Sequence, residues 1–265
     1  MSKSTALEFT DAAAYERCMG RWSRTAGSAF LEWLAPPAHV RWLEVGCGTG
    51  VFTDVLLKAG SPAEVIAVDP STSQIEHAFR QTGTPQVQFR IADAQALPFA
   101  DASFDIVVSA LVINFIPDRS RAVAEMRRVA RPGGLIAGYV WDFASHRSPS
   151  WPLRRGLRRF GVDTPDVPGT DDSSLAALER LFERSGLQAI ATGAIESSLT
   201  YCDFADFWDA QTPSYSPMTR SIASMTADDR ERLMRIVEEE LPTRPDGVIE
   251  YSARAHAIRA RRPFV

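Results

Sequence analysis

Residues 43–50 read L-E-V-G-C-G-T-G, an apolar strand end that runs into three glycines spaced two residues apart. Gly46, Gly48 and Gly50 lack a Cβ, so the backbone can turn sharply and approach a ligand closely. The residues that follow, 51–58, predict a helix whose free N–H groups face whatever lies on the glycines. A plain strand-to-helix turn needs only one glycine, so the stretch favours a nucleotide-type site.

Acidic residues after the next two predicted strands strengthen this interpretation. The run E-V-I-A-V-D ends at Asp69, where the second parallel strand of a βαβ unit delivers a carboxylate beside the first loop. A third strand, 87–91, leads to Asp93. Ligands of open α/β sheets bind outside the carboxyl ends of the strands, so Asp69 is placed to accept both ribose hydroxyls and Asp93 to accept an adenine amino group. For either Asp taken singly, a turn or cap role is the alternative.

These residues resemble the class I S-adenosylmethionine-dependent methyltransferases, in a bacterial branch that acts on small molecules. The likeness comprises, in chain order, the glycine stretch, V-D-P-S at 68–71, A-D-A-Q-A-L-P-F at 92–99, D-A-S-F-D-I-V-V-S at 101–109 and R-R-V-A-R-P-G-G at 127–134. A weaker likeness includes M-G-R-W-S-R at 19–24 and V-W-D at 140–142. The resemblance implies an α/β fold with a doubly wound, mostly parallel seven-stranded sheet and helical cap or lid insertions. It also implies methyl transfer from S-adenosylmethionine to a small-molecule acceptor by in-line displacement.

The pattern along the chain predicts a single methyltransferase domain over residues 1–265, with a helical lid at 10–35. Two stretches, 142–172 and 203–241, break the alternation of strands and helices, and long irregular segments in compact domains are usually functional. We expect these two excursions to cover the acceptor. Their aromatic side chains are candidate walls of its pocket, with core packing as the alternative for each: Trp141, Trp151, Trp208 and Tyr215.

Periodicity predicts the individual elements. The expected strands are 40–45, 64–69, 87–91, 104–109, 135–141, 188–198 and 248–262. The expected helices are 51–58, 71–81, 119–130 and 174–185, with two further helical stretches in the second excursion.

The resemblance assigns the methionine part of the cofactor to the first loop. Gly46 and Gly48 make room for it, and Glu44 holds its ammonium group directly or through water. Cys47 lies within the same loop, where we expect a small packing residue that borders the cofactor rather than a nucleophile.

The adenosine part is assigned to the ends of the second and third strands. Asp69 takes the ribose diol, Pro70 flanks the adenine, Asp93 takes the adenine amino group, and the Ala94 N–H donates to a ring nitrogen.

The reactive methyl group is expected to lie above Ser109 and the backbone up to Leu111. Tyr15 and Arg24, on the N-terminal lid, are expected to close over the cofactor carboxylate, with helix packing or a solvated charge as the alternative.

A general base is needed only if the acceptor is a hydroxyl that loses its proton during attack. Among four histidines, His146 alone follows a strand's carboxyl end in an excursion, so it is the candidate catalytic residue, with Asp142 as a rival. The basic run R-R-G-L-R-R at 154–159 is read as a solvated helix face, with attraction of an anionic acceptor as the alternative.

Composition narrows the partners and the compartment. The net charge of −4 over 265 residues gives no general attraction to nucleic acid, and the position that often carries N-P-P-Y in nucleic-acid amino methyltransferases reads S-A-L-V. Three dispersed cysteines lack metal-ligand spacing, so no metal is expected. No stretch predicts a membrane span or a secretory leader, which favours a cytoplasmic protein. We expect a monomer or a homodimer.

Two other functions remain open at this point. A dinucleotide-dependent oxidoreductase fits half of its fingerprint through Gly46, Gly48 and Asp69, but the third glycine position is Val51. A regulatory module that holds S-adenosylmethionine without turnover would use the same fold.

Overall fold

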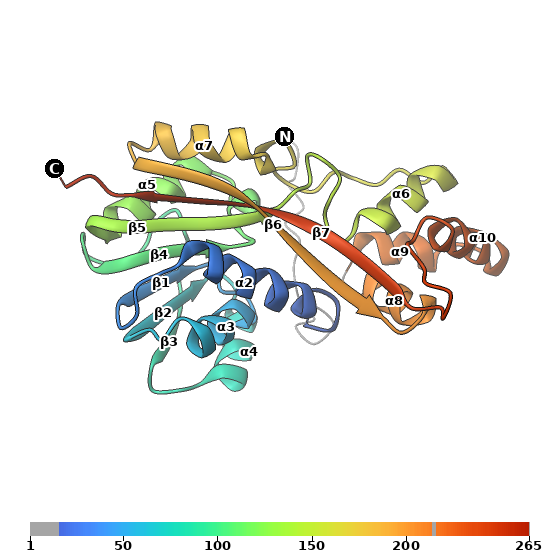
Figure 1. The fold of residues 1–265 in the computed structure, drawn as a ribbon, viewed down its shortest axis with the longest axis horizontal. Helices are drawn as coiled ribbons and strands as arrows, with labels where there is room; N and C mark the ends of the chain where they lie inside the picture. The colour runs from blue at the N-terminus through green and yellow to red at the C-terminus, as the bar shows by residue number, and fades with distance from the viewer. Residues whose placement is uncertain (1–15, 214–215, 265) are drawn as a thin grey trace.

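We describe the protein from a computed structural model, which places residues 16–213 and 216–264. Seven strands form one sheet in the order β3-β2-β1-β4-β5-β7-β6, and helices cover both of its faces (Figure 1). The first five strands are parallel, and β7 is antiparallel to both β5 and β6. This order confirms the predicted doubly wound, mostly parallel seven-stranded sheet.

The strands lie close to the ranges that periodicity predicts. They are β1 (Arg41–Val45), β2 (Glu64–Asp69), β3 (Val87–Ile91), β4 (Phe104–Ala110), β5 (Ala130–Trp141), β6 (Gln188–Tyr201) and β7 (Ile249–Arg261). The helices are α2 (Arg21–Leu34), α3 (Val51–Ala59), α4 (Thr72–Thr82), α5 (Arg119–Val129), α6 (Trp151–Phe160), α7 (Leu175–Arg184), α8 (Phe204–Gln211), α9 (Pro217–Ala223) and α10 (Ala227–Glu238). A π-helical turn, Glu16–Gly20, precedes α2, and short 3-10 turns lie at Ile113–Phe115 and Asp171–Ser173.

Side chains that start these helices explain where several of them begin. Ser71, Asp118 and Ser174 each accept a hydrogen bond from a backbone N–H three residues later, which satisfies one of the open donors of α4, α5 and α7. Asp203 and Thr226 do the same for α8 and α10. The caps set the helix starts within one residue of the expected positions in the sheet region.

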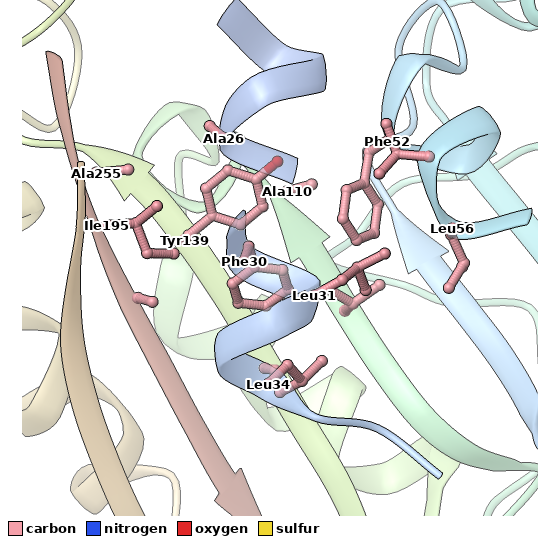
Figure 2. Close-up of a cluster of buried hydrophobic side chains, with 14 of the residues drawn as sticks. Ala26, Phe30, Leu31, Leu34, Phe52, Leu56, Ala110, Tyr139, Ile195 and Ala255 are labelled. Carbon is pink, nitrogen blue, oxygen red and sulfur yellow. The ribbon is translucent and has the colours of Figure 1, made fainter. Parts of the chain in front are cut away.

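Two buried layers hold the sheet between its helices. On one face, the apolar side of α2 packs with α3 against the central strands, and Phe30 stacks on Tyr139 with 4.5 Å between ring centroids (Figure 2). On the other face, α5 and α7 cover strand residues such as Val107 and Ile136. The core is therefore divided by the sheet, which fixes the carboxyl strand ends between the two layers.

A third buried cluster lies beyond the sheet and joins α6, α8, α9 and α10 to the far ends of β6 and β7 (Figure 1). Its members include Leu157, Tyr201, Trp208, Leu233 and Ile249. We call this unit the cap. The long antiparallel strands β6 and β7 run from the sheet into the cap, and the segment that connects them carries α8, α9 and α10.

The structure corrects two predicted boundaries. Strand β5 begins at Ala130 rather than 135, because Ala130 pairs with Phe104 before a register shift and the Gly133 N–H donates to the Arg262 carbonyl at 2.9 Å. The R-P-G-G run that follows α5 therefore belongs to β5, which lies between β4 and β7 inside the sheet. The second excursion holds three helices rather than two, since Pro217 begins a separate short helix.

Candidate functional site: a cavity at the carboxyl ends of the strands

The glycine loop leaves β1 and turns into α3 with all three glycines at positive φ, between 51° and 84°. A Cβ on Gly46 would lie 2.5 Å from the Val112 side chain, and one on Gly50 would lie 3.1 Å from the Ala78 Cβ. A Cβ on Gly48 would meet nothing within 4 Å. Two glycines thus allow close packing, whereas Gly48 leaves open space beside the loop, as a cradle for a ligand requires.

Asp69, at the end of β2, ties the glycine loop to the start of α4. Its Oδ2 accepts the Gly48 N–H and its Oδ1 accepts the Ser71 N–H, both at 2.9 Å. Burial raises the pKa of the Asp69 carboxyl above its ordinary value, while the two N–H donors lower it. Each carboxylate oxygen has a second lone pair, so the carboxylate can still accept hydroxyl donors from a ligand.

Glu44, in β1, is a buried carboxyl with one open oxygen. Its Oε2 accepts a 2.6 Å hydrogen bond from the Thr53 hydroxyl of α3, and its Oε1 has no hydrogen-bond partner. Burial raises the pKa of Glu44 to about 8, the Thr53 hydrogen bond lowers it, and the nearby Asp69 charge raises it further. A buried acceptor without a partner carries a desolvation cost that a cationic donor would relieve.

Cys47 is a buried thiol inside the loop. Burial raises its pKa well above the ordinary value, with Glu44 and Asp69 acting in the same direction. The Cys47 side chain therefore stays protonated at neutral pH. This state suits the packing role and not a nucleophile, because the thiolate is the reactive form.

Residues from four strand ends line one cavity of about 660 Å³, within the usual range for small-molecule sites. The polar part carries three carboxylates: Glu44 lies in β1, Asp69 ends β2, and Asp93 follows β3. The Asp93 carboxylate accepts from the Gln95 backbone N–H at 2.8 Å and is exposed. Predicted contacts Gly46, Cys47, Gly48, Pro70, Ala94 and Leu111 line the same cavity.

The rest of the lining is largely apolar. Phe52 of α3, Ala110 of β4 and Tyr139 of β5 belong to the hydrophobic cluster next to α2 (Figure 2). All three also line the cavity. The loop after β4 contributes further apolar side chains: Leu111, Val112, Phe115, Ile116 and Pro117. Leu111 holds a positive φ of 61° and donates its N–H to the Tyr139 carbonyl at 2.8 Å. A strained non-glycine backbone of this kind is often found at ligand sites.

Several predicted contacts lie elsewhere. Ser109 is fully buried and is not part of the cavity lining, because side chains alternate along β4 and its neighbour Ala110 faces the cavity. Arg24 is exposed on α2 and does not line the cavity, although Ser23 beside it does. Tyr15 lies outside the described residues.

His146 and Asp142 are not in the lining either. His146 is exposed and stacks on Trp151 with ring centroids 4.0 Å apart. Asp142 is buried, accepts the Ser145 N–H at 2.8 Å and lies 3.4 Å from the His256 Nε2. The described structure brings neither residue to the cavity, so a role as base stays an untested prediction for both.

The excursions do not line this cavity within the described residues, contrary to the expected acceptor roof. Trp208 belongs to the core of the cap, Trp141 packs edge-on against Trp22, and Tyr215 lies outside the described residues. Three arginines of the basic run form salt bridges within the protein: Arg155 and Arg159 pair with Glu240, and Arg158 pairs with Asp166. Trp208 therefore stabilises the cap, and Trp141 stabilises the main core next to the sheet.

Three residues of the site were not predicted from the sequence: Val112 and Tyr139, which line the cavity, and Thr53, which contacts Glu44. Thr53 is the third residue of the helix that follows the glycines, a position that points back toward the strand end. Its place in the motif is the signal that could have identified it. Val112 directly follows the predicted contact Leu111, whereas tertiary packing brings Tyr139 to the cavity.

Residues 16–213 and 216–264 lack two kinds of feature. No group of three or more His, Cys, Asp or Glu side chains is arranged to hold a metal ion there. None of the helices in that part of the chain has the length and apolar content needed to cross a membrane.

Comparisons with known proteins place these features in a family. Residues 43–138 match the model of a methyltransferase domain. A ubiquinone/menaquinone biosynthesis C-methyltransferase of Dinoroseobacter shibae is 33% identical over 150 residues, covering 55% of this chain and 59% of that protein. A methyltransferase of Mycobacterium tuberculosis is 35% identical over 146 residues, covering 55% and 56%. The chain spans about half the length of the curated relatives it matches.

The solved structures agree on the fold. An S-adenosylmethionine-dependent methyltransferase of Thermotoga maritima superposes with a TM-score of 0.55 at 21% identity, over 94% of each chain. The matched domain ends at residue 138 and contains the glycine loop with the ends of β1 to β4, where the cavity lies. The family match gives no support to the dinucleotide oxidoreductase. Motifs, strand order and relatives together indicate that residues 43–138 form a methyltransferase domain of the class I S-adenosylmethionine-dependent type.

Proposed function

We propose that this protein transfers a methyl group from S-adenosylmethionine to a small, partly apolar acceptor by in-line displacement. One observation carries the proposal: a single cavity joins three carboxylates at successive strand ends to an apolar wall from β4, β5 and α3. The carboxylates suit the polar atoms of an adenosyl amino acid, and the apolar wall suits the acceptor.

The cofactor's fit rests on features of this chain. The open Oε1 of Glu44 suits an ammonium donor, the space beside Gly48 suits the amino-acid part, and Asp69 retains lone pairs for a ribose diol. Asp93, Ala94 and Pro70 would hold the adenine. When bound, the cofactor supplies an electrophilic methyl group on a sulfonium, whose thioether is a good leaving group.

The protein's own contribution is alignment. Holding acceptor and methyl group at the attack distance can supply several kcal/mol, up to about 7 to 11 kcal/mol in ideal intramolecular cases. Phe52, Leu111 and Tyr139 would exclude water from the acceptor and restrict its approach. Among the described lining residues, the carboxylates Glu44, Asp69 and Asp93 are all assigned to the cofactor, which leaves none of them as a base for the acceptor. An acceptor that is nucleophilic without a base therefore fits the apolar wall best.

The relatives agree with a small acceptor. The C-methyltransferase of D. shibae is named for ubiquinone and menaquinone biosynthesis, and quinones are partly apolar ring compounds. We extend only the chemical class to this chain, because its own cavity has a largely apolar wall after β4.

Isothermal titration with S-adenosylmethionine, S-adenosylhomocysteine, NAD and NADP tests the cofactor assignment. We expect micromolar binding of the first two and none of the nicotinamide cofactors. A second assay follows formation of S-adenosylhomocysteine with panels of quinols, phenols and amines. Stronger binding of NAD or NADP would overturn the assignment, and cofactor binding without turnover on any panel would favour the non-catalytic module.

A further inference from the structure

Thr53 lies in the first turn of α3, is fully buried, and directs its hydroxyl to strand β1 rather than to its own helix. Its Oγ1 donates a 2.6 Å hydrogen bond to the Glu44 Oε2. A helical threonine commonly returns its hydroxyl to a carbonyl one turn earlier. The contact with Glu44 is thus a use of the hydroxyl that helix formation does not require.

The hydrogen bond fixes one oxygen of Glu44 and leaves the other open. Oε1 is buried without a partner, and Glu44 lines the cavity. The terminal torsion of a glutamate is broad, so an unheld carboxylate would take several orientations. With Oε2 held by Thr53, the orientation of the open oxygen is restricted before any ligand arrives.

We infer that Thr53 is a positioning residue: it holds Glu44 so that the open carboxylate oxygen receives the ammonium group of the cofactor's amino-acid part. The inference rests on the proposed function, which supplies that cationic ligand. Thr53 acts through Glu44 and does not itself line the cavity.

The electrostatic surroundings explain why Glu44 needs this partner. Burial in β1 and the Asp69 charge from β2 both raise its pKa, and the Cys47 thiol of the loop is the other titratable neighbour. The Thr53 hydroxyl of α3 is the contact that lowers the pKa of Glu44. Removing the hydroxyl would therefore leave the carboxyl more fully protonated and a poorer acceptor for a cation.

Two substitutions and two ligands test the inference on the full chain. Thr53→Val keeps the shape and removes the hydroxyl, and Thr53→Ser keeps the hydroxyl and removes the methyl group. S-adenosylhomocysteine carries the ammonium group, whereas methylthioadenosine has the adenosine and lacks the amino acid. Affinities are measured by calorimetry across pH, with a thermal melt of each variant.

We expect Thr53→Val to bind S-adenosylhomocysteine about tenfold more weakly, the size of a lost hydrogen bond to a charged group. Its methylthioadenosine affinity should stay within about twofold, and Thr53→Ser should behave like the wild type toward both ligands. The wild-type affinity for S-adenosylhomocysteine should rise with pH as Glu44 ionises, and the midpoint should move to higher pH in Thr53→Val. In a Glu44→Gln background, Thr53→Val should have no further effect.

Equal weakening of both ligands by Thr53→Val, or failure of Thr53→Ser to rescue, would assign Thr53 to packing and overturn the inference. Wild-type affinity in Thr53→Val would overturn it as well. A wild-type protein that binds neither ligand would instead refute the proposed function, so the two failures are distinguishable.

Discussion

The end of the cavity that carries Glu44, Asp69 and Asp93, which we call the cofactor end, and the cap are built in opposite ways. At the cofactor end, backbone N–H groups, glycines and carboxylates from neighbouring strand ends meet within short loops, and polar atoms remain open to the cavity. In the cap, residues from four helices and from the antiparallel pair β6–β7 pack into a closed apolar cluster. The first region is organised by local backbone geometry and the second by side-chain burial. A substitution should therefore affect ligand binding in the first region and stability in the second.

The largest expected effect separates the two regions directly. Trp208→Ala removes a nearly buried indole from the cap core, and truncation of a buried aromatic residue costs about 3 to 5 kcal/mol. We expect that loss in the free energy of unfolding by chemical denaturation, with S-adenosylhomocysteine affinity within about threefold of the wild type. Phe79→Ala is the control, since that phenylalanine is 66% exposed. A Trp208→Ala protein that is stable but binds cofactor poorly would connect the cap to the cavity.

A smaller effect is expected inside the cofactor end. Asp69→Ala removes the proposed acceptor for two ribose hydroxyls and also two hydrogen bonds that hold the loop, so cofactor affinity should fall about a hundredfold. Asp93→Ala removes one exposed acceptor and should cost about tenfold or less. Calorimetry with S-adenosylhomocysteine compares the two variants. An equal or greater loss at Asp93 would show that the strand ends are assigned in the wrong order.

The smallest expected effect concerns the charge of Glu44 in the protein without ligand. Its pKa of about 8 lies above the ordinary value of 4.5, so the folded state binds the proton more tightly than the unfolded state. This contribution to stability is fully present below about pH 4.5 and is lost as pH rises toward 8. At about 1.4 kcal/mol per pH unit, roughly 2 kcal/mol should be lost between about pH 5.5 and pH 7.

The comparison of wild type with Glu44→Gln isolates this dependence. Glutamine has nearly the same shape and does not titrate, so its stability curve should be flatter over the same pH range. Parallel curves for the two proteins would mean that the Glu44 carboxyl is solvated or paired in solution.

The same contrast explains what the sequence could predict. The turn at Gly46 to Gly50, the carboxylate of Asp69 and the seven strands were predictable, because each depends on neighbours within a few residues or on a repeated strand and helix pattern. Tyr139 could not be assigned to the cavity, because its position there depends on packing against Phe30 of α2 and Phe52 of α3, which are distant in the sequence. Trp208 was expected at the acceptor, since an aromatic run has the same composition in a pocket wall as in a core. Only packing separates those two uses.

The continuous pairing of β6 with β7 restricts how the cap can move relative to the sheet. The pairing continues without a register shift from Ala191 opposite Arg259 to Tyr201 opposite Ile249, where it reaches the cap. A hinge needs residues that absorb large backbone rotations, and a ladder of paired residues has none to spare. We therefore expect the paired strands to be stiff and to transmit a displacement of the cap to the antiparallel side of the sheet. The cap should move with that side of the sheet as one rigid body and not by a hinge motion.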